Sequence, residues 1–123
     1  MSIGLLFLAK GRWNGKSLLT ESWVSESTRT ISRTDFPDAL SGYGYLWWTA
    51  AGESVAAPRG IPPTSYTAAG AGGHFMTIVP SLSTVIVTRV NTFDPATWSP
   101  IANPRNYSMF VREILAAHPD RAA

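Results

Sequence analysis

The stretch "GHFMTIVPSLSTVIVTRVN", Gly73 to Asn91, carries the strongest structural signal in the chain. It holds two runs rich in β-branched residues, "GHFMTIVP" and "STVIVTRVN", and such runs predict strands. Pro80 to Ser83 join the two runs, and a connection of this length is typical of an antiparallel hairpin. Both runs are apolar on both faces, so we expect other elements to cover the hairpin on its two sides.

A glycine-rich segment precedes this hairpin. The stretch "YTAAGAGGHFMTIVP", Tyr66 to Pro80, reads as a glycine loop that leads straight into the first strand. Gly70, Gly72 and Gly73 allow a positive φ or a close approach of the backbone to a ligand. Alternatively, these glycines only avoid a clash with a neighbouring strand where the first strand begins. The residues by themselves leave both interpretations open.

Helices are predicted on either side of the strands. A short helix is expected over Ile3 to Ala9, and a second over "ESWVSEST" with Thr20 as its N-cap. The C-terminal helix has Asn103 as N-cap and Pro104 at its first position. Its apolar stripe comprises Tyr107, Phe110, Val111, Ile114 and Leu115.

The remaining segments complete a fold-class prediction. Asn14-Gly15 indicates a tight turn, and "GYGYLWWTA", Gly42 to Ala50, reads as a strand whose Trp47 and Trp48 cover its two faces. Polar or proline-rich segments at 29–42, 51–64 and 93–104 are expected to be irregular. The order of elements predicts an α+β fold. We expect an antiparallel sheet of about three strands, flanked by N-terminal helices and a C-terminal helix.

Composition narrows the possible partners. The chain has 123 residues, and its charged fraction of 15% is low against an average of about 25%. This predicts an apolar surface that meets another chain or a missing segment. The net charge of +2 comes from scattered basic residues, so no nucleic-acid partner is expected. Ile3 to Ala9 is too short to span a membrane and lacks the flanks of a signal peptide, so we expect no membrane partner and assign no compartment.

Several kinds of chemistry are excluded by the residues present. The chain has no cysteine, and its eight carboxylates form no close pair. No nucleophile elbow, Walker motif or dinucleotide-binding glycine pattern occurs, so we expect no metal and no cofactor. His118 lies near the end of the C-terminal helix, where a structural role is expected. For His74, a structural role and a substrate contact remain alternatives.

Three segments, in this order, resemble the C-terminal third of the serine β-lactamase-related hydrolases. They are "GLLFLAKGRWNGKSLLTESWVSEST", "GYGYLWW" and "AGAGGHFMTIVPSLSTVIVTRVN", and the resemblance covers about Ile3 to Leu115. This superfamily includes class C β-lactamases, related esterases and penicillin-binding-protein-like hydrolases. The resemblance implies that residues 1–123 form a single partial domain of a β-lactamase-like fold.

The resemblance also implies a set of site residues. The third motif of these enzymes, usually Lys-Thr-Gly on a sheet strand, falls on Ala68, Ala69 and Gly70. The following residue, Ala71, would then supply a backbone N–H to the oxyanion hole, where small residues let the donor approach the reacting carbonyl. The pocket rim would include Tyr66, Gly72, Gly73 and His74.

The chain departs from the family pattern in two ways. Ala68 replaces the third-motif lysine, which disfavours a β-lactamase and favours an esterase or amidase. No Ser-x-x-Lys is present, because Phe7 and Trp13 stand three residues before the two lysines, Lys10 and Lys16. No tyrosine is followed by Asn in a Tyr-x-Asn pattern either. Without an activated serine the chain has no covalent route for acyl transfer, so we expect it to be inactive alone.

Two functional hypotheses follow. The first is a C-terminal segment of a serine hydrolase that works with a missing N-terminal catalytic segment. The second is a self-standing α+β module that binds a partner or forms a homo-oligomer.

Overall fold

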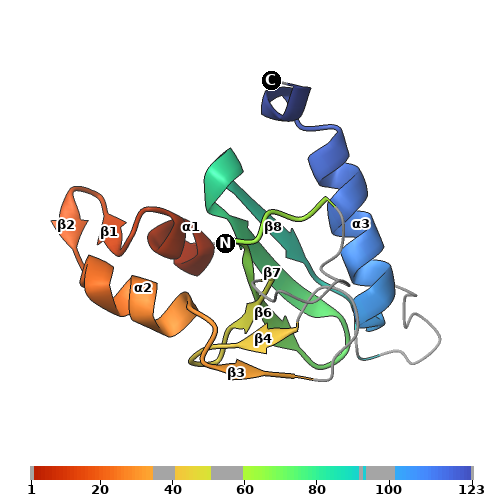
Figure 1. The fold of residues 1–123 in the computed structure, drawn as a ribbon, viewed down its shortest axis with the longest axis horizontal. Helices are drawn as coiled ribbons and strands as arrows, with labels where there is room; N and C mark the ends of the chain where they lie inside the picture. The colour runs from red at the N-terminus through yellow and green to blue at the C-terminus, as the bar shows by residue number, and fades with distance from the viewer. Residues whose placement is uncertain (1, 35–40, 51–59, 92, 94–101, 123) are drawn as a thin grey trace.

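The computed structural model describes residues 2–34, 41–50, 60–91, 93 and 102–122. Within these ranges the chain has an α+β fold with three α-helices and antiparallel sheets, which confirms the predicted fold class (Figure 1). The helices are α1 (Ser2–Leu8), α2 (Glu21–Thr28) and α3 (Pro104–Ala116). The predictions for residues 51–59 and for most of 93–104 fall outside the described residues.

The main sheet has six strands, where the sequence suggested about three. In spatial order these are β3 (Ser32–Arg33), β4 (Gly42–Tyr43), β5 (Trp48–Thr49), β6 (Tyr66–Gly70), β7 (His74–Val79) and β8 (Thr84–Thr88). All neighbouring strands are antiparallel. Three of them are only two residues long, which is too short to show the alternation that marks a strand in a sequence.

Two sequence predictions are wrong in this sheet. Gly42 to Ala50 is not one strand but a hairpin of β4 and β5, because the chain turns at Leu46 with a φ of 62° and the Gly44 N–H donates to the Trp47 carbonyl. Tyr66 to Gly70 is not the glycine loop that its residues suggested but strand β6, as the resemblance implied for residues 68–70, and only residues 71–73 form the turn into β7. β3 likewise lies inside a segment expected to be irregular.

The β7–β8 hairpin is confirmed. Five residue pairs join the strands, from Phe75 opposite Thr88 to Val79 opposite Thr84. The connection is a short 3₁₀ turn, η1 (Pro80–Leu82), which ends at Ser83 in the left-handed conformation with a φ of 48°. The hairpin stands at the centre of the molecule with α3 on one side and α1 on the other (Figure 1).

Helix α3 forms the larger core with one face of the sheet. The Asn103 side chain accepts a hydrogen bond from the Arg105 N–H, as the N-cap prediction required. The helix buries three apolar side chains against the sheet, those of Tyr107, Val111 and Leu115, and they meet Phe75, Val79 and Ile86. Phe110 was predicted in this stripe, but it is 38% exposed and is not part of this core cluster.

Helix α1 covers part of the opposite face. Phe7 and Leu8 pack on a cluster of Trp47, Tyr66 and Ile78. The Phe7 and Trp47 rings lie 4.7 Å apart, and the Trp47 and Tyr66 rings 5.1 Å apart. Gly4 permits this close contact, since a methyl group there would lie 2.7 Å from Val85 Cγ1.

The segment after α1 leads into α2 through a small hairpin of β1 (Arg12–Trp13) and β2 (Lys16–Ser17). Its two central residues, Asn14 and Gly15, both have positive φ angles, which confirms the predicted tight turn. The Thr20 hydroxyl accepts a hydrogen bond from the Trp23 N–H at 3.1 Å, which confirms the predicted cap of α2. An exposed ion pair of 2.7 Å joins Lys10 to Glu21.

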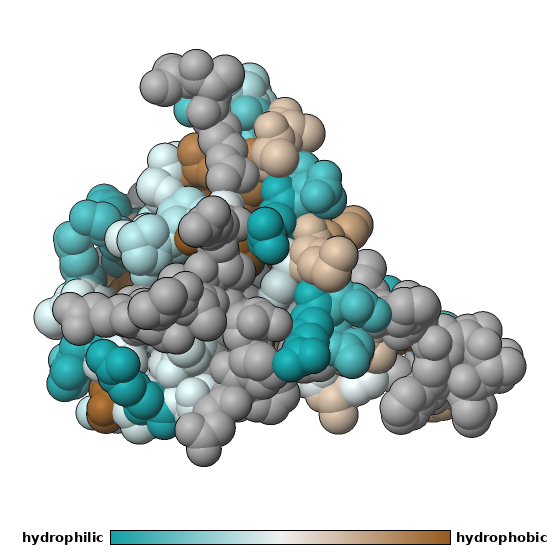
Figure 2. All heavy atoms as spheres, turned by 45° about the vertical axis from the view of Figure 1, so that its right-hand side comes forward, coloured by the Kyte–Doolittle hydropathy of each residue, from teal (hydrophilic) through white to brown (hydrophobic). Residues whose placement is uncertain are grey.

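The surface retains many large apolar side chains. The most exposed of the described ones are Ile3, Leu18, Trp23, Ile31, Tyr45, Leu46, Phe93 and Met109. Figure 2 shows hydrophobic residues interspersed among hydrophilic ones on one side of the molecule. The number of exposed apolar groups agrees with the low charged fraction of the chain.

Candidate functional site

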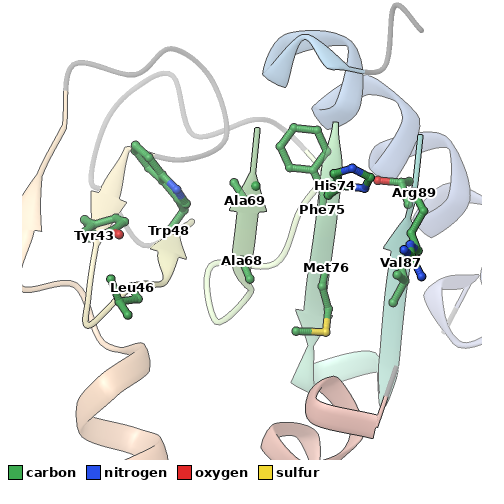
Figure 3. Close-up of a pocket in the computed structure, with 12 residues that line it drawn as sticks. Tyr43, Leu46, Trp48, Ala68, Ala69, His74, Phe75, Met76, Val87 and Arg89 are labelled. Carbon is green, nitrogen blue, oxygen red and sulfur yellow. The ribbon is translucent and has the colours of Figure 1, made fainter. Parts of the chain in front are cut away.

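A groove of about 620 Å³ opens where β5 diverges from β6. This volume is typical of a small-molecule site. Figure 3 shows Tyr43, Leu46 and Trp48 on one side of the groove, Ala68 and Ala69 in its middle, and β7 and β8 on the other side. On that side it is lined by His74, Phe75 and Met76 of β7, by Val87 and Thr88 of β8, and by Arg89, which directly follows β8.

The groove exists because strand pairing stops early. β5 pairs with β6 only through Trp48 opposite Thr67 and Thr49 opposite Tyr66. Continuing this register would place Leu46 opposite Ala69, but the chain turns away at Leu46 to form the hairpin with β4. Among the described residues, the part of β6 from Ala68 to Gly70 therefore has a strand partner only on its β7 side.

Small side chains deepen this open edge. Ala69, Gly70 and Ala71 are exposed, and Ala68 is half-buried. Ala68 and Ala69 point to opposite faces of the sheet, yet both line the groove, because no strand of the described ranges pairs with this edge of β6. Backbone groups at an uncovered edge are free to pair with an extended ligand.

Large apolar side chains form the rim opposite β6. The rings of Tyr43 and Trp48 meet edge to face at 4.9 Å. Leu46 is 82% exposed and adopts a left-handed conformation, which is unusual for a leucine. Trp47 and Trp48 point to opposite sides, as predicted: Trp47 is buried against α1, and Trp48 lines the groove.

Most of the residues predicted for the site come together here. Ala68, Ala69, Gly70 and His74 line the groove, and residues 71–73 form the turn at its end. His74 is half-buried at the start of β7. His118 lies elsewhere, with its Nε2 3.2 Å from the Thr84 hydroxyl, so it ties the end of α3 to β8.

Tyr66 is separated from the others. It stands at the opposite end of β6 from Ala71, about 16 Å away along the strand. Its ring is buried between Phe7 and Trp47, and it does not line the groove. Burial raises the pKa of Tyr66 to about 12, so its phenol stays protonated at neutral pH and is a poor general base.

Comparison with known proteins leaves the site to be interpreted from its geometry. Neither the family models nor the curated proteins gave a match to this chain. Within the described ranges, no group of three His, Cys, Asp or Glu side chains is placed to hold a metal ion. No α-helix in those ranges is long and apolar enough to cross a membrane.

Eight groove residues were not predicted as site residues from the sequence: Tyr43, Leu46, Trp48, Phe75, Met76, Val87, Thr88 and Arg89. A signal for three of them existed. Alternation along a hairpin places every second residue on one face, so the predicted β7–β8 register would have aligned Met76 with Val87 and His74 with Arg89. Tyr43 and Leu46 had no such signal, because they reach the groove only through the unexpected turn between β4 and β5.

Gly70 at the end of β6 and Gly73 in the turn differ in whether the backbone requires a glycine there. Gly73 has a φ of 90°, and a methyl group there would lie 2.9 Å from Ala102 Cα. Gly70 does not have a positive φ, and the nearest contact of a methyl group there would be an ordinary 3.4 Å. The interpretation that glycine only avoids a steric clash therefore explains Gly73 but does not explain Gly70.

We expect Gly73→Ala to lower the free energy of unfolding by about 2 kcal/mol, because alanine is strained at that φ and collides with backbone. Gly70→Ala is the matched control and should change it by less than about 0.5 kcal/mol. Urea unfolding followed by circular dichroism measures both. Equal effects of the two substitutions would contradict the steric assignment of Gly73.

Proposed function

We propose that this chain is the C-terminal part of a serine hydrolase related to the β-lactamases, of the esterase or amidase type. The observation that carries the proposal is the open edge of β6 at Ala68–Gly70, which ends in the exposed residue Ala71 beside a groove. An extended acyl group can lie along such an edge. In the proposal, the backbone N–H of Ala71, at the end of this edge, is the oxyanion donor.

The surroundings of Ala71 support this role. The residues on either side of it, Gly70 and Gly72, carry no side chains that could obstruct a tetrahedral intermediate. Ala71 is exposed, so the described residues leave room for an acyl group. The apolar rim of Leu46 and Trp48 suits the acyl or leaving group of an ester.

The nucleophile would come from outside these residues. Lys10 forms an ion pair with Glu21, and Phe7, three residues before it, is an aromatic core residue. This pair therefore offers no serine and base in contact, and covalent catalysis needs both. In the proposal, a segment with Ser-x-x-Lys packs on the α1 side of the sheet and points its serine at Ala71.

Purified chain 1–123 should not release nitrophenol from p-nitrophenyl esters or open a chromogenic cephalosporin above the buffer rate, because an oxyanion donor has nothing to stabilise without a nucleophile. The measurement is absorbance with a stopped-flow search for a burst. A burst together with an acyl adduct on any serine of the chain would contradict this expectation.

The decisive test uses the longest product of the gene that contains these residues. A fluorophosphonate probe should label it on a serine of a Ser-x-x-Lys sequence that lies outside residues 1–123, as mapped by mass spectrometry. Labelling should disappear when that serine is replaced by alanine. A gene product without such a serine, or one that the probe leaves unlabelled, would overturn the proposed function.

A self-assembling α+β module is the second candidate, favoured by the exposed apolar groups around α1 and α2. Trp23 is 48% and Tyr45 46% exposed, and their stacked rings lie 5.7 Å apart in contact with solvent. Leaving large apolar side chains in water costs about 1.5–3 kcal/mol each, so covering them is favourable.

We expect the isolated chain to self-associate, and Trp23→Ser combined with Tyr45→Ser to weaken the association by at least about tenfold. Sedimentation velocity over a hundredfold range of concentration measures this. A double substitution at Ser22 and Ser25, both to alanine, is the control on the same helix. A monomer throughout the range would count against this candidate.

A further inference from the structure

The sheet face that carries α1 is only partly covered. Cross-strand pairing places Tyr66, Ile78 and Val85 in one row, and α1 packs on this row. The next row, toward the β6–β7 turn, is Ala68, Met76 and Val87. Met76 is half-buried, because its side chain also reaches α1 beside Gly4, and Val87 is 40% exposed, so this apolar row is partly covered and forms the floor of the groove.

A polar row lies beside this apolar floor. Gly70 pairs with His74, and continuing the β7–β8 register by one residue brings Arg89 opposite His74. Figure 3 shows the side chains of His74, at the start of β7, and Arg89, directly after β8, at the same side of the groove as Met76 and Val87. The floor of the groove is thus apolar along one row and rich in hydrogen-bond donors along the next.

Arg89 has a charge without a counterion in the described part of the chain. The ion pairs found there join Lys10 to Glu21, Arg29 to Glu26, and His118 to Asp120. An exposed arginine at the border of an apolar groove can form bidentate hydrogen bonds with a carboxylate, and its planar donor fork fits that group better than a lysine does.

We propose that the groove binds a small ligand with an apolar body and one carboxylate. The body lies on Ala68, Met76 and Val87, and the carboxylate accepts hydrogen bonds from Arg89 and from the His74 imidazole. Gly70 completes the site because a larger residue in the same row would fill the space beside His74. Apolar area and a charge-assisted hydrogen bond then act together in one site.

The inference that the substrate of the enzyme carries a carboxylate rests on the proposed function. Arg89 lies two strand spacings from the edge of β6, or about 10 Å. A substrate whose carbonyl meets the Ala71 N–H would therefore carry its carboxylate several bonds from that carbonyl. The inference that the groove binds a carboxylate does not depend on the proposed function, because all the residues involved belong to this chain.

The test uses the whole 123-residue chain labelled with ¹⁵N and two ligands of equal size, 4-phenylbutyrate and its neutral amide. We expect saturable shift changes at the backbone amides of residues 68–76 and 86–89 with the carboxylate, and about tenfold weaker binding of the amide. Raising the salt concentration to about 0.5 M should weaken the binding of the carboxylate but not that of the amide, because salt screens the attraction between exposed charges. Equal affinity for the two ligands, or the absence of saturable shifts, would overturn the proposal.

Two variants test whether Arg89 is the positive charge that binds the carboxylate. Arg89→Gln should abolish the preference for the carboxylate, whereas Arg112→Gln, at an exposed position of α3, should retain it. The same spectra show whether each variant is folded. Equal loss in both variants would mean nonspecific attraction and would overturn the site. A third ligand, acetyl-Ala-Ala-Phe with a free carboxylate, tests whether the carboxylate belongs to a small molecule or to the C-terminus of a peptide. If this peptide binds more tightly than phenylbutyrate, the proposed small-molecule ligand is wrong and a peptide C-terminus takes its place.

The outcomes distinguish this site from the proposed hydrolase. Carboxylate binding by the chain, together with failure of the fluorophosphonate probe, would leave the binding site standing and remove the hydrolase. Labelling by the probe without carboxylate selectivity would do the reverse.

Discussion

Ala71→Pro should lower the turnover of the proposed complete hydrolase by about 10²–10³-fold, while Ala71→Gly should leave it nearly unchanged. The proposed contribution of Ala71 is its N–H, which glycine retains and proline lacks. The φ of Ala71 is not positive, so proline does not have to reverse the direction of the backbone. The measurement is kcat on an ester substrate, with folding followed by circular dichroism.

A second substitution at the same position removes the donor without a ring. Introducing lactic acid in place of Ala71 by nonsense suppression converts the amide to an ester, so the N–H is lost and the methyl group stays. We expect a loss of turnover similar to that of Ala71→Pro, with little change in KM, because the donor acts mainly in the transition state. A folded ester variant with full turnover would refute the oxyanion assignment.

Leu115→Ala should lower the free energy of unfolding by about 2–5 kcal/mol. Leu115 is fully buried where α3 meets the sheet, in the cluster with Val79 and Ile86. Truncating it loses apolar contacts and leaves a cavity between two elements that cannot both relax into the gap. For a domain with a total stability of about 5–15 kcal/mol, this is a large fraction.

The matched control is Met109→Ala on the same helix. Met109 is 61% exposed, so its truncation should cost less than about 0.5 kcal/mol with the same helix propensity at the new residue. Chemical unfolding in urea, monitored by tryptophan fluorescence, compares the two. Equal midpoints for both variants would mean that α3 does not form the core with β7 and β8.

The proposed carboxylate site and the proposed oxyanion site involve different residues, so substitutions in them should have different effects. Arg89→Gln should change the selectivity of the complete hydrolase for charged over neutral esters, whereas Ala71→Pro should slow both. In the two proposals, binding at Arg89 and chemistry at Ala71 are therefore separable by these two substitutions.

Local signals in the sequence were enough for several elements. The β7–β8 hairpin follows from two β-branched runs around Pro80–Ser83, and α3 follows from the Asn103–Pro104 start and the spacing of its apolar residues. The cap at Thr20 and the turn at Asn14-Gly15 depend on neighbours within a few residues. Each of these features is determined by interactions that are close in the chain, so a short window contains the information.

Contacts between segments that are distant in the sequence determine that residues 66–70 form strand β6 and that the groove exists. Tyr66 to Gly70 is poor in β-branched residues, yet it forms a strand because β7 supplies five residue pairs to it. The groove exists because β5 stops pairing at Thr67, which depends on the turn at Leu46. His74 and Arg89 become neighbours only through the register of β7 on β8. Propensity and periodicity act within one segment, whereas a binding site is formed by the relative placement of several segments, and that placement is set by packing.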